Sequence, residues 1–274
     1  MSGNIEPGMT KPIHRRELAG AEVEVFATAA DAYESAIDRL ATLIRDCLDA
    51  RGKAVLGLAT GATPEPVYAG LVREHQARAL SFAQVSTYNL DEYYPMSPLD
   101  PNSYRAYMDR HLFSQVDLTV NRAHLLDGTV PEAFANDHGA GYDRWIAAEG
   151  GLDLQLLGLG RNGHIGFNEP TDLPVEQSLA LPTRLVELHP TTIADAARDF
   201  GGEANVPRQA LTMGIATILA ARSILILAFG DRKAPAVARS LTGPVCSEVP
   251  GSLLQTDPGK VTWMIDRAAA AELL

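Results

Sequence analysis

The sequence is poor in cysteine, in basic residues and in long apolar runs, and each deficit excludes a class of protein. Among 274 residues there are two cysteines, Cys47 and Cys246, which are too few for a disulfide scaffold or a four-ligand zinc site. The longest aliphatic run, around residues 224–229, is too short to cross a bilayer. Neither a low-complexity tract nor a fixed-period repeat occurs. We therefore expect a globular, cytoplasmic protein that does not bind membranes.

Positive charge is also scarce, and this limits the partners of the protein. Lys and Arg number 23 against 34 Asp and Glu, which gives a net charge of −11. A long-range field of this sign disfavours nucleic acid. Salt screens exposed charges beyond about 8 Å, so local positive groups can still hold a small phosphorylated molecule. The expected partner is a small molecule, and composition does not choose between a monomer and a homo-oligomer.

Apolar runs alternate with helical patterns along most of the chain. We expect strands over residues 54–59, 84–90, 123–126, 153–159, 183–188, 223–229 and 261–265. Helices are expected over residues 33–48, 65–78, 103–113, 132–148 and 232–241. This alternation predicts an α/β fold with a Rossmann-like, doubly wound, mostly parallel sheet and helices on both faces, in three layers. Residues 1–20 are expected to be a disordered or loosely attached extension of a single α/β domain over residues 21–274.

Ligands of doubly wound sheets bind beyond the carboxyl ends of the strands, so the residues that follow each strand are the candidates for a site. Four clusters occupy such positions, at residues 60–64, 91–92, 160–170 and 230–233. Because parallel strands end at the same edge of a sheet, these clusters are expected to meet in one crevice.

Two of the clusters could bind a phosphate. Residues 60–64 (TGATP) join a strand to a helix, where free N–H groups and the helix dipole favour an anion. They also fit an ordinary helix start with Thr63 as the N-cap and Pro64 in the first turn. Lys233 begins another helix, where the dipole disfavours a cation unless an anion lies nearby. A solvated surface lysine is the alternative.

The other two clusters could transfer protons. Asp91 and Glu92 would point to opposite sides of an extended chain, so only one can enter the crevice, and their spacing does not say which. A carboxylate in a desolvated cleft has a raised pKa, which suits a general base. The alternative is that the two adjacent acids lie on a solvated loop and have no catalytic function. The loop at 160–170 collects Asn162, His164 and Glu169, which favours acid–base chemistry over a core histidine bound to a carbonyl.

Neither a nicotinamide cofactor nor a metal is expected. Gly158, Gly160 and Gly163 match the spacing G-x-G-x-x-G, but residues 164–170 hold another glycine and a proline where a helix should begin. The two cysteines lie in other segments and no His-x-x-x-His pair occurs. A further set at helical spacing is interpreted as ordinary helix packing: Tyr104, Tyr107, Met108 and His111.

Five segments together resemble the glucosamine-6-phosphate deaminase (glucosamine-6-phosphate isomerase) family, in order from about residue 54 to 265. They are LGLATGATPEPVY, STYNLDEYYP, DPNSYRAYM, LLGLGRNGHIGFNEP and the stretch at 211–237. The resemblance implies an enzyme of amino-sugar catabolism that needs no cofactor. It would convert glucosamine-6-phosphate and water into fructose-6-phosphate and ammonia, which combines deamination with an aldose–ketose isomerisation.

The resemblance also implies roles for single residues. Asp91 corresponds to the proton-transferring aspartate, His164 to the ring-opening histidine and Glu169 to its support. Asn162 stands where one branch of the family has an aspartate, which changes the environment of the histidine but not the expected activity. The phosphate-binding residues implied are Thr60, Gly61, Ala62, Thr63, Lys233 and Arg198.

Three other functions are compatible with parts of the sequence. A galactosamine-6-phosphate deaminase differs only in the epimer it accepts. A 6-phosphogluconolactonase shares the fold and the Gly-His core but differs in the acidic motif and after the histidine. A non-catalytic sugar-phosphate sensor is disfavoured because the chain is acidic, lacks a helix-turn-helix segment and keeps Asp91, His164 and Glu169. Residues 171–181 differ from the branch that binds N-acetylglucosamine-6-phosphate allosterically, so activation of that kind is not expected.

Overall fold

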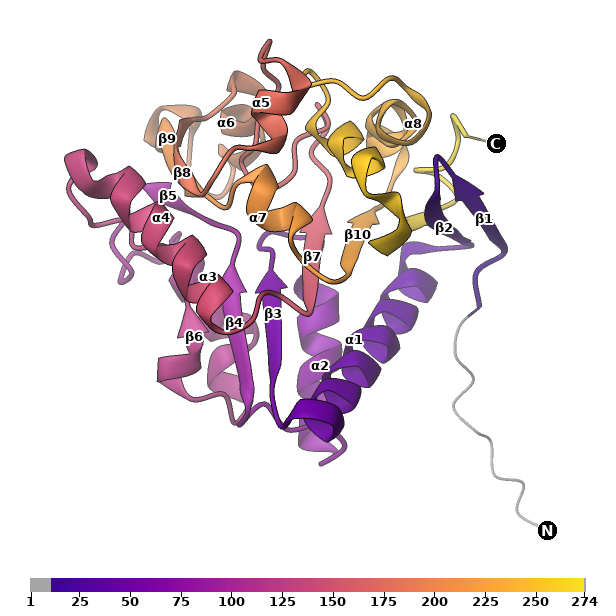
Figure 1. The fold of residues 1–274 in the computed structure, drawn as a ribbon, viewed down its shortest axis with the longest axis horizontal. Coiled ribbons are helices and arrows are strands. Elements are labelled where there is room, and N and C mark those ends of the chain that lie inside the picture. Colours follow the sequence, from indigo (N-terminus) through magenta and orange to yellow (C-terminus); the bar gives the residue numbers. More distant parts are fainter. Residues whose placement is uncertain (1–10, 274) are drawn as a thin grey trace.

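Eight strands form the central sheet of the protein, which a computed structural model describes over residues 11–273 (Figure 1). In order across the sheet they are β1 (His14–Leu18), β2 (Ala21–Phe26), β11 (Val261–Asp266), β10 (Ile224–Ala228), β7 (Leu154–Gly158), β3 (Ala54–Leu58), β4 (Val85–Asn89) and β6 (Ala123–His124). All neighbours are parallel except β1 and β2. The predicted, mostly parallel sheet is confirmed.

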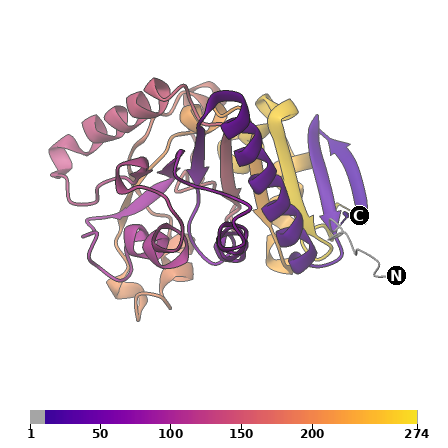
Figure 2. The ribbon, with the colours of Figure 1, turned by 90° about the horizontal axis from the view of Figure 1, so that it is seen from below.

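Helices cover both faces of this sheet, and each face has its own apolar core (Figure 2). On one face lie α1 (Ala29–Arg51), α2 (Glu65–Gln76) and α3 (Tyr104–His111). On the other lie α4 (Glu132–Ala148), α7 (Ile215–Leu219) and α8 (Ala234–Thr242). Trp263 and Met264 of β11 point into different cores, as alternation along a buried strand requires. The three-layer, doubly wound fold is therefore confirmed.

The ends of α1 follow from local capping. Gly52 has φ +70, a conformation that glycine adopts readily, and ends the helix. The helix begins at Ala29, earlier than the predicted start at residue 33. The reason is a capping box, in which the Thr28 side chain accepts from the Asp31 N–H and Asp31 accepts from the Thr28 N–H.

The amino-terminal segment differs from the prediction of a loose extension over residues 1–20. His14–Leu18 form β1 and pair with β2, while residues 1–10 lie outside the described part of the chain. This strand carries the polar sequence HRREL and has no apolar alternation. Ladder hydrogen bonds and ion pairs of Arg15 with Glu22 and Glu24 hold it instead, which is why an apolar pattern missed it.

A second, antiparallel sheet stands beside the first and consists of β5 (Asp91–Tyr94), β9 (Gln209–Thr212) and β8 (Arg184–Glu187). The sequence predicts β8 but neither β5 nor β9. Only Leu90 separates β4 from β5. Its N–H donates to the Leu58 carbonyl at 2.9 Å, and its own carbonyl accepts from the Met213 N–H at 2.6 Å. Asp91 therefore lies at the junction of the two sheets. The remaining α-helices within residues 11–273 are α5 (Val175–Leu179) and α6 (Pro190–Ala196).

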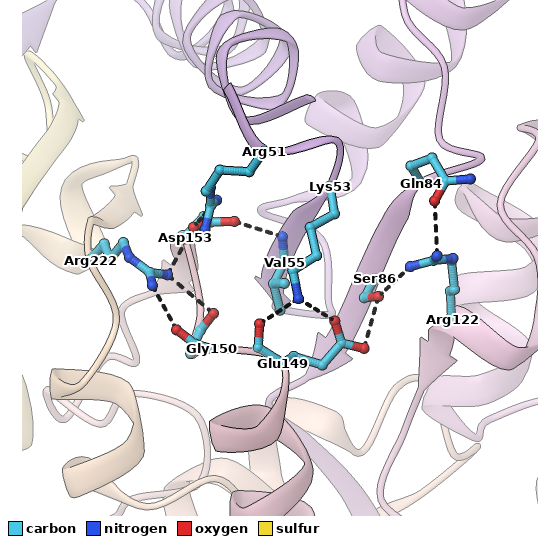
Figure 3. Close-up of polar contacts among 11 residues, drawn as sticks. Arg51, Lys53, Val55, Gln84, Ser86, Arg122, Glu149, Gly150, Asp153 and Arg222 are labelled. Carbon is cyan, nitrogen blue, oxygen red and sulfur yellow. Dashed lines mark hydrogen bonds and ion pairs between the residues drawn. The ribbon is translucent and has the colours of Figure 1, made fainter. Parts of the chain in front are cut away.

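A polar network closes the amino ends of the strands (Figure 3). The Asp153 side chain is 3% exposed and accepts hydrogen bonds from the Val55 N–H and from Arg222, both at 2.9 Å. Arg51 makes a further ion pair with the same carboxylate. One buried carboxylate thus joins β3, the start of β7 and two arginines from distant parts of the chain.

We expect Asp153→Ala to lower the free energy of unfolding by about 2–4 kcal/mol, since it leaves a buried N–H and two arginines without their acceptor. Urea denaturation followed by circular dichroism measures the effect. Asp46→Ala is the matched control, because Asp46 is exposed on α1, and we expect a change within about 0.5 kcal/mol. Equal stabilities of the two variants would contradict the role assigned to the network.

Candidate functional site

A cavity of about 720 Å³ lies at the carboxyl ends of the parallel strands. Thr60, which follows β3, and Gly160, which follows β7, both line it. These neighbouring strands mark the point where the strand order reverses, since the chain runs from β3 to β4 on one side and to β7 on the other. Such switch points are where ligands bind in doubly wound folds. The cavity contains residues from all four clusters that the sequence singles out.

The loop after β3 lines one end of the cavity with Thr60, Gly61, Ala62 and Thr63. Thr63 does not cap α2. Pro64 occupies the N-cap position and no side-chain capping bond forms, so the Thr63 hydroxyl is not consumed by the helix. The Tyr107 hydroxyl instead donates to the Gly61 carbonyl at 2.7 Å and fixes the loop from the opposite wall. The loop presents backbone and hydroxyl donors to an anion.

Lys233 lies in the same cavity, just before α8. Its Nζ donates to the Leu159 carbonyl at 2.7 Å, and no carboxylate within residues 11–273 forms an ion pair with it. Burial lowers the pKa of Lys233, an effect that Asp195 opposes. An ammonium with one carbonyl partner has two further N–H donors for a ligand.

Arg198 lines the rim of the cavity rather than its interior. Its side chain is 92% exposed, and Nε lies 3.5 Å from the Asp199 carboxylate. It can reach a ligand only by moving its side chain inward.

His164 lines the cavity and is held from behind. Its Nδ1 lies 2.7 Å from Asn162 Oδ1 and 3.3 Å from Glu169 Oε2. Asn162 Nδ2 donates in turn to Glu169 Oε2 at 3.0 Å. Because Oδ1 and Oε2 are acceptors, Nδ1 carries a proton in this arrangement, and Nε2 is the nitrogen available to a ligand.

Glu169 is an ionised partner for this histidine. Burial alone would raise the pKa of Glu169, but interactions with His164 and hydrogen bonds from Thr192 and Asn162 lower it to about 2. The Thr192 hydroxyl donates to Glu169 Oε1 at 2.5 Å and lies 3.4 Å from His164 Nδ1. Thr192 was missed in the sequence, where nothing marks this α6 threonine as a neighbour of the histidine loop.

Asp91 lines the cavity and Glu92 does not. The strand β5 sends the two side chains to opposite sides, and this settles a choice that their spacing left open. Burial, and then the negative charge of Glu92, raise the pKa of Asp91 well above its usual range. The cavity therefore contains a carboxylate of unusual basicity and the imidazole of His164.

Glycine shapes the loop that carries His164. A Cβ at Gly160 would lie 2.3 Å from the imidazole ring, so no larger residue fits there without displacing the histidine. Gly163 has φ +90, a conformation that other residues rarely adopt. No helix follows this loop until α5 at Val175, which confirms that the dinucleotide fingerprint lacks the helix it requires.

The wall opposite this loop comes from α3. Tyr104 and Tyr107 pack against apolar clusters, as predicted, and together with His111 they also line the cavity. Met108 of the same helix is fully buried and packs in the core. Helical spacing identified one face of α3 but could not say that this face borders a cavity.

Within residues 11–273 no group of three or more His, Cys, Asp and Glu side chains is placed to hold a metal ion. No helix in that part of the chain is long and apolar enough to span a bilayer.

The fold and the cavity define a doubly wound α/β protein whose crevice combines a buried carboxylate, a histidine–carboxylate pair and a lysine. The sequence model of the family "Glucosamine-6-phosphate isomerases/6-phosphogluconolactonase" matches residues 27–263, and the chain belongs to this family. The resemblance seen in the sequence motifs is thereby confirmed.

Several relatives are similar over most of their length. A glucosamine-6-phosphate deaminase of Rhodopirellula baltica is 50% identical over 241 residues, which cover 88% of this chain and 93% of the relative. One of Geobacillus is 44% identical over 237 residues, covering 86% and 91%. The structure of a monomeric glucosamine-6-phosphate deaminase is 40% identical with a TM-score of 0.84, covering 91% of this chain and 99% of that one. A 6-phosphogluconolactonase from Trypanosoma cruzi, 19% identical with a TM-score of 0.73 over 95% of this chain and 99% of that one, shares the fold.

Proposed function

We propose that this protein is a deaminase that converts glucosamine-6-phosphate and water into fructose-6-phosphate and ammonia in amino-sugar catabolism. The observation that carries the proposal is that Asp91, His164 and Lys233 line one cavity. Curated relatives named for this activity are 41–50% identical to the chain, which supports the choice of substrate. The cytoplasm is the proposed location, in keeping with the free thiols of Cys47 and Cys246.

The phosphate group binds at the end of the cavity formed by residues 60–63 and Lys233. Lys233 supplies the charge, the loop supplies N–H and hydroxyl donors, and Arg198 closes on the phosphate from the rim. Each charge-assisted hydrogen bond contributes about 1.5–3 kcal/mol. Binding energy at the phosphate fixes C1 and C2 of the sugar beside the catalytic groups.

The sugar ring opens first, by proton transfer at His164. Nε2 takes the proton of the O1 hydroxyl and a proton is delivered to the ring oxygen, which leaves an aldehyde at C1. Glu169, ionised at neutral pH, stabilises the imidazolium that forms on the way. Asn162 holds Nδ1 and keeps the ring oriented.

The isomerisation and the loss of ammonia follow at Asp91. The Asp91 carboxylate takes the C2 proton while O1 gains a proton, which gives an enolamine. Asp91 then returns a proton to C1 while the amino group loses one, which leaves an imine at C2. Water adds to C2, ammonia leaves, and the ketone of fructose-6-phosphate remains. No step requires a redox partner, because the oxidation of C2 is balanced by the reduction of C1.

The test is the formation of ammonia and fructose-6-phosphate from glucosamine-6-phosphate with no metal or nicotinamide added. We expect stoichiometric release of both products. The absence of turnover at high enzyme concentration would show that the proposed function is wrong. A parallel determination of kcat/KM on galactosamine-6-phosphate identifies the preferred epimer.

Lys233→Met is expected to raise KM for glucosamine-6-phosphate by about 10- to 100-fold, because it removes one charge-assisted contact with the phosphate. Steady-state kinetics measure the change. Lys53→Met is the matched control, since Lys53 Nζ also donates to a backbone carbonyl, that of Glu149 at 2.7 Å, but lies at the amino ends of the strands. If both variants have the same KM, Lys233 does not bind the phosphate.

A further inference from the structure

Glu92 is a buried carboxylate for which the reaction above has no use. Its side chain is on the opposite side of β5 from the cavity, and the residue is 2% exposed. Within residues 11–273 no Lys, Arg or His forms an ion pair with it, and burial of an uncompensated carboxylate is costly. The burial of a second carboxylate directly after Asp91 therefore needs a physical explanation.

The carboxylate of Glu92 ties two elements of the site together. Oε1 accepts from the Tyr93 N–H at 2.9 Å and from the Tyr104 N–H at 3.0 Å, and Oε2 accepts from the Arg105 N–H at 3.2 Å. Tyr104 and Arg105 are the first two residues of α3, where free N–H groups carry partial positive charge. Glu92 thus binds the first turn of α3 to strand β5.

This tie reaches the catalytic side of the strand. Tyr104 stands on the cavity wall, with its ring centroid 5.0 Å from that of Tyr93 and 6.0 Å from that of Phe167, on which it stacks. Asp91 lines the same cavity, and its charge acts on the Tyr104 phenol. Movement of α3 away from β5 would shift Tyr104 relative to Asp91.

The charge of Glu92 also acts on Asp91. Burial raises the pKa of Glu92 to about 7 although three N–H groups oppose the shift. Two adjacent buried carboxylates disfavour each other's ionisation, so each increases the proton affinity of its neighbour.

Among the residues that the structure describes, no cation opposes the raised pKa of Asp91. The groups that face Asp91 from α2, α3, α4 and β5 are neutral phenols: Tyr68, Tyr104, Tyr142 and Tyr93. Glu92 faces Asp100 and borders a second cavity whose titratable residues are Arg105, Asp109, His124 and Asp127. The Arg105 guanidinium there is bound to Asp109 at 3.0 Å.

We propose that Glu92 is a positioning residue for the deamination, which ties α3 to the strand that carries Asp91 and keeps a second negative charge beside Asp91. Asp91 becomes a stronger base for the C2 proton, whose removal is difficult because carbon acids are weak. This inference rests on the proposed function, in which Asp91 is the base.

Two variants separate the charge of Glu92 from its tie to α3. Glu92→Gln keeps the length of the side chain and one acceptor oxygen but removes the charge. Glu92→Asp keeps the charge, while its shorter side chain cannot reach both N–H groups of the first turn. The measurement is kcat and kcat/KM on glucosamine-6-phosphate across pH for both variants and the wild type. Ionisations of the substrate are common to all three and do not affect the comparison.

For Glu92→Gln we expect the acid limb of kcat/KM to move to lower pH by at least about half a unit, because the neighbouring charge no longer raises the pKa of Asp91. We expect kcat to fall about threefold for each half unit by which the base weakens. Glu92→Asp should lower kcat and leave the acid limb in place.

The proposal is overturned if folded Glu92→Gln, checked by circular dichroism, keeps the wild-type limb, whether or not kcat falls. If this variant does not fold, Glu92→Asp decides: a lower kcat with an unmoved limb supports the proposal, and an unchanged kcat overturns it. Failure of both variants to fold would make Glu92 a stability residue only. Inactivity of the wild type would instead overturn the proposed function.

Discussion

Asp91→Asn is expected to lower kcat for glucosamine-6-phosphate by about 10³-fold or more, with substrate binding retained, because an amide cannot accept the C2 proton. The structure gives the Asp91 side chain no hydrogen bond within residues 11–273, so the exchange removes little besides the base. Steady-state kinetics give kcat, and calorimetric titration with the substrate gives its binding to the variant.

Asp195→Asn is the control for this experiment. Asp195 is another carboxylate that lines the cavity, and it is held by Arg161 on the rim. We expect its kcat to stay within a few-fold of the wild type. Comparable losses in both variants would indicate a general effect of charge in the cavity and would contradict the role of Asp91 as base.

The pH dependence of the reaction follows from the same carboxylate. The base must be ionised, and burial together with Glu92 raises the pKa of Asp91. Activity therefore declines as the pH falls through this raised pKa, well above the pH of about 3.9 at which an ordinary aspartate titrates. Glu169 does not contribute to this limb, because its pKa of about 2 keeps it ionised throughout.

His164→Gln is expected to lower kcat by about 10²- to 10³-fold, since ring opening loses its acid–base catalyst. Asp91 is intact in this variant, so the later proton transfer is not impaired. Ring opening then limits the rate, and we expect the kinetic isotope effect of substrate deuterated at C2 to fall towards unity. Rates with protonated and deuterated substrate measure it directly.

The matched control is His138→Gln, a histidine of α4 that does not line the cavity, for which we expect wild-type kcat. A His164→Gln variant with wild-type kcat would contradict the ring-opening role. A slow variant that shows a large isotope effect at C2 would instead place His164 in the later proton transfer.

Local features of the sequence predicted most of the central sheet. Five apolar strands and the helices between them follow from hydrophobic periodicity, and Gly52 marks the end of α1. The loop at 160–170 was expected to be irregular because glycine and proline disfavour a helix there, and it contains none. These features depend on a few neighbouring residues, so the sequence alone specifies them.

The sequence also located the cavity to within a few residues. Residues 60–63, Asp91, His164 and Lys233 all follow parallel strands, and such positions meet at one edge of the sheet for topological reasons. Arg198 could not be located in this way, because it does not directly follow a strand. Only the family resemblance indicated it.

Only the tertiary structure decided how these residues are arranged. The sequences of β1 and β5 carry no apolar alternation that would have predicted them. Strand β1 exists because it pairs with the neighbouring β2, and β5 because it pairs with the distant β9. That pairing turns Asp91 into the cavity and Glu92 towards α3, and the packing of α6 brings Thr192 to Glu169. The sequence by itself determined which segments meet at the crevice. Which side chains enter it depends on hydrogen bonds between residues far apart in the chain.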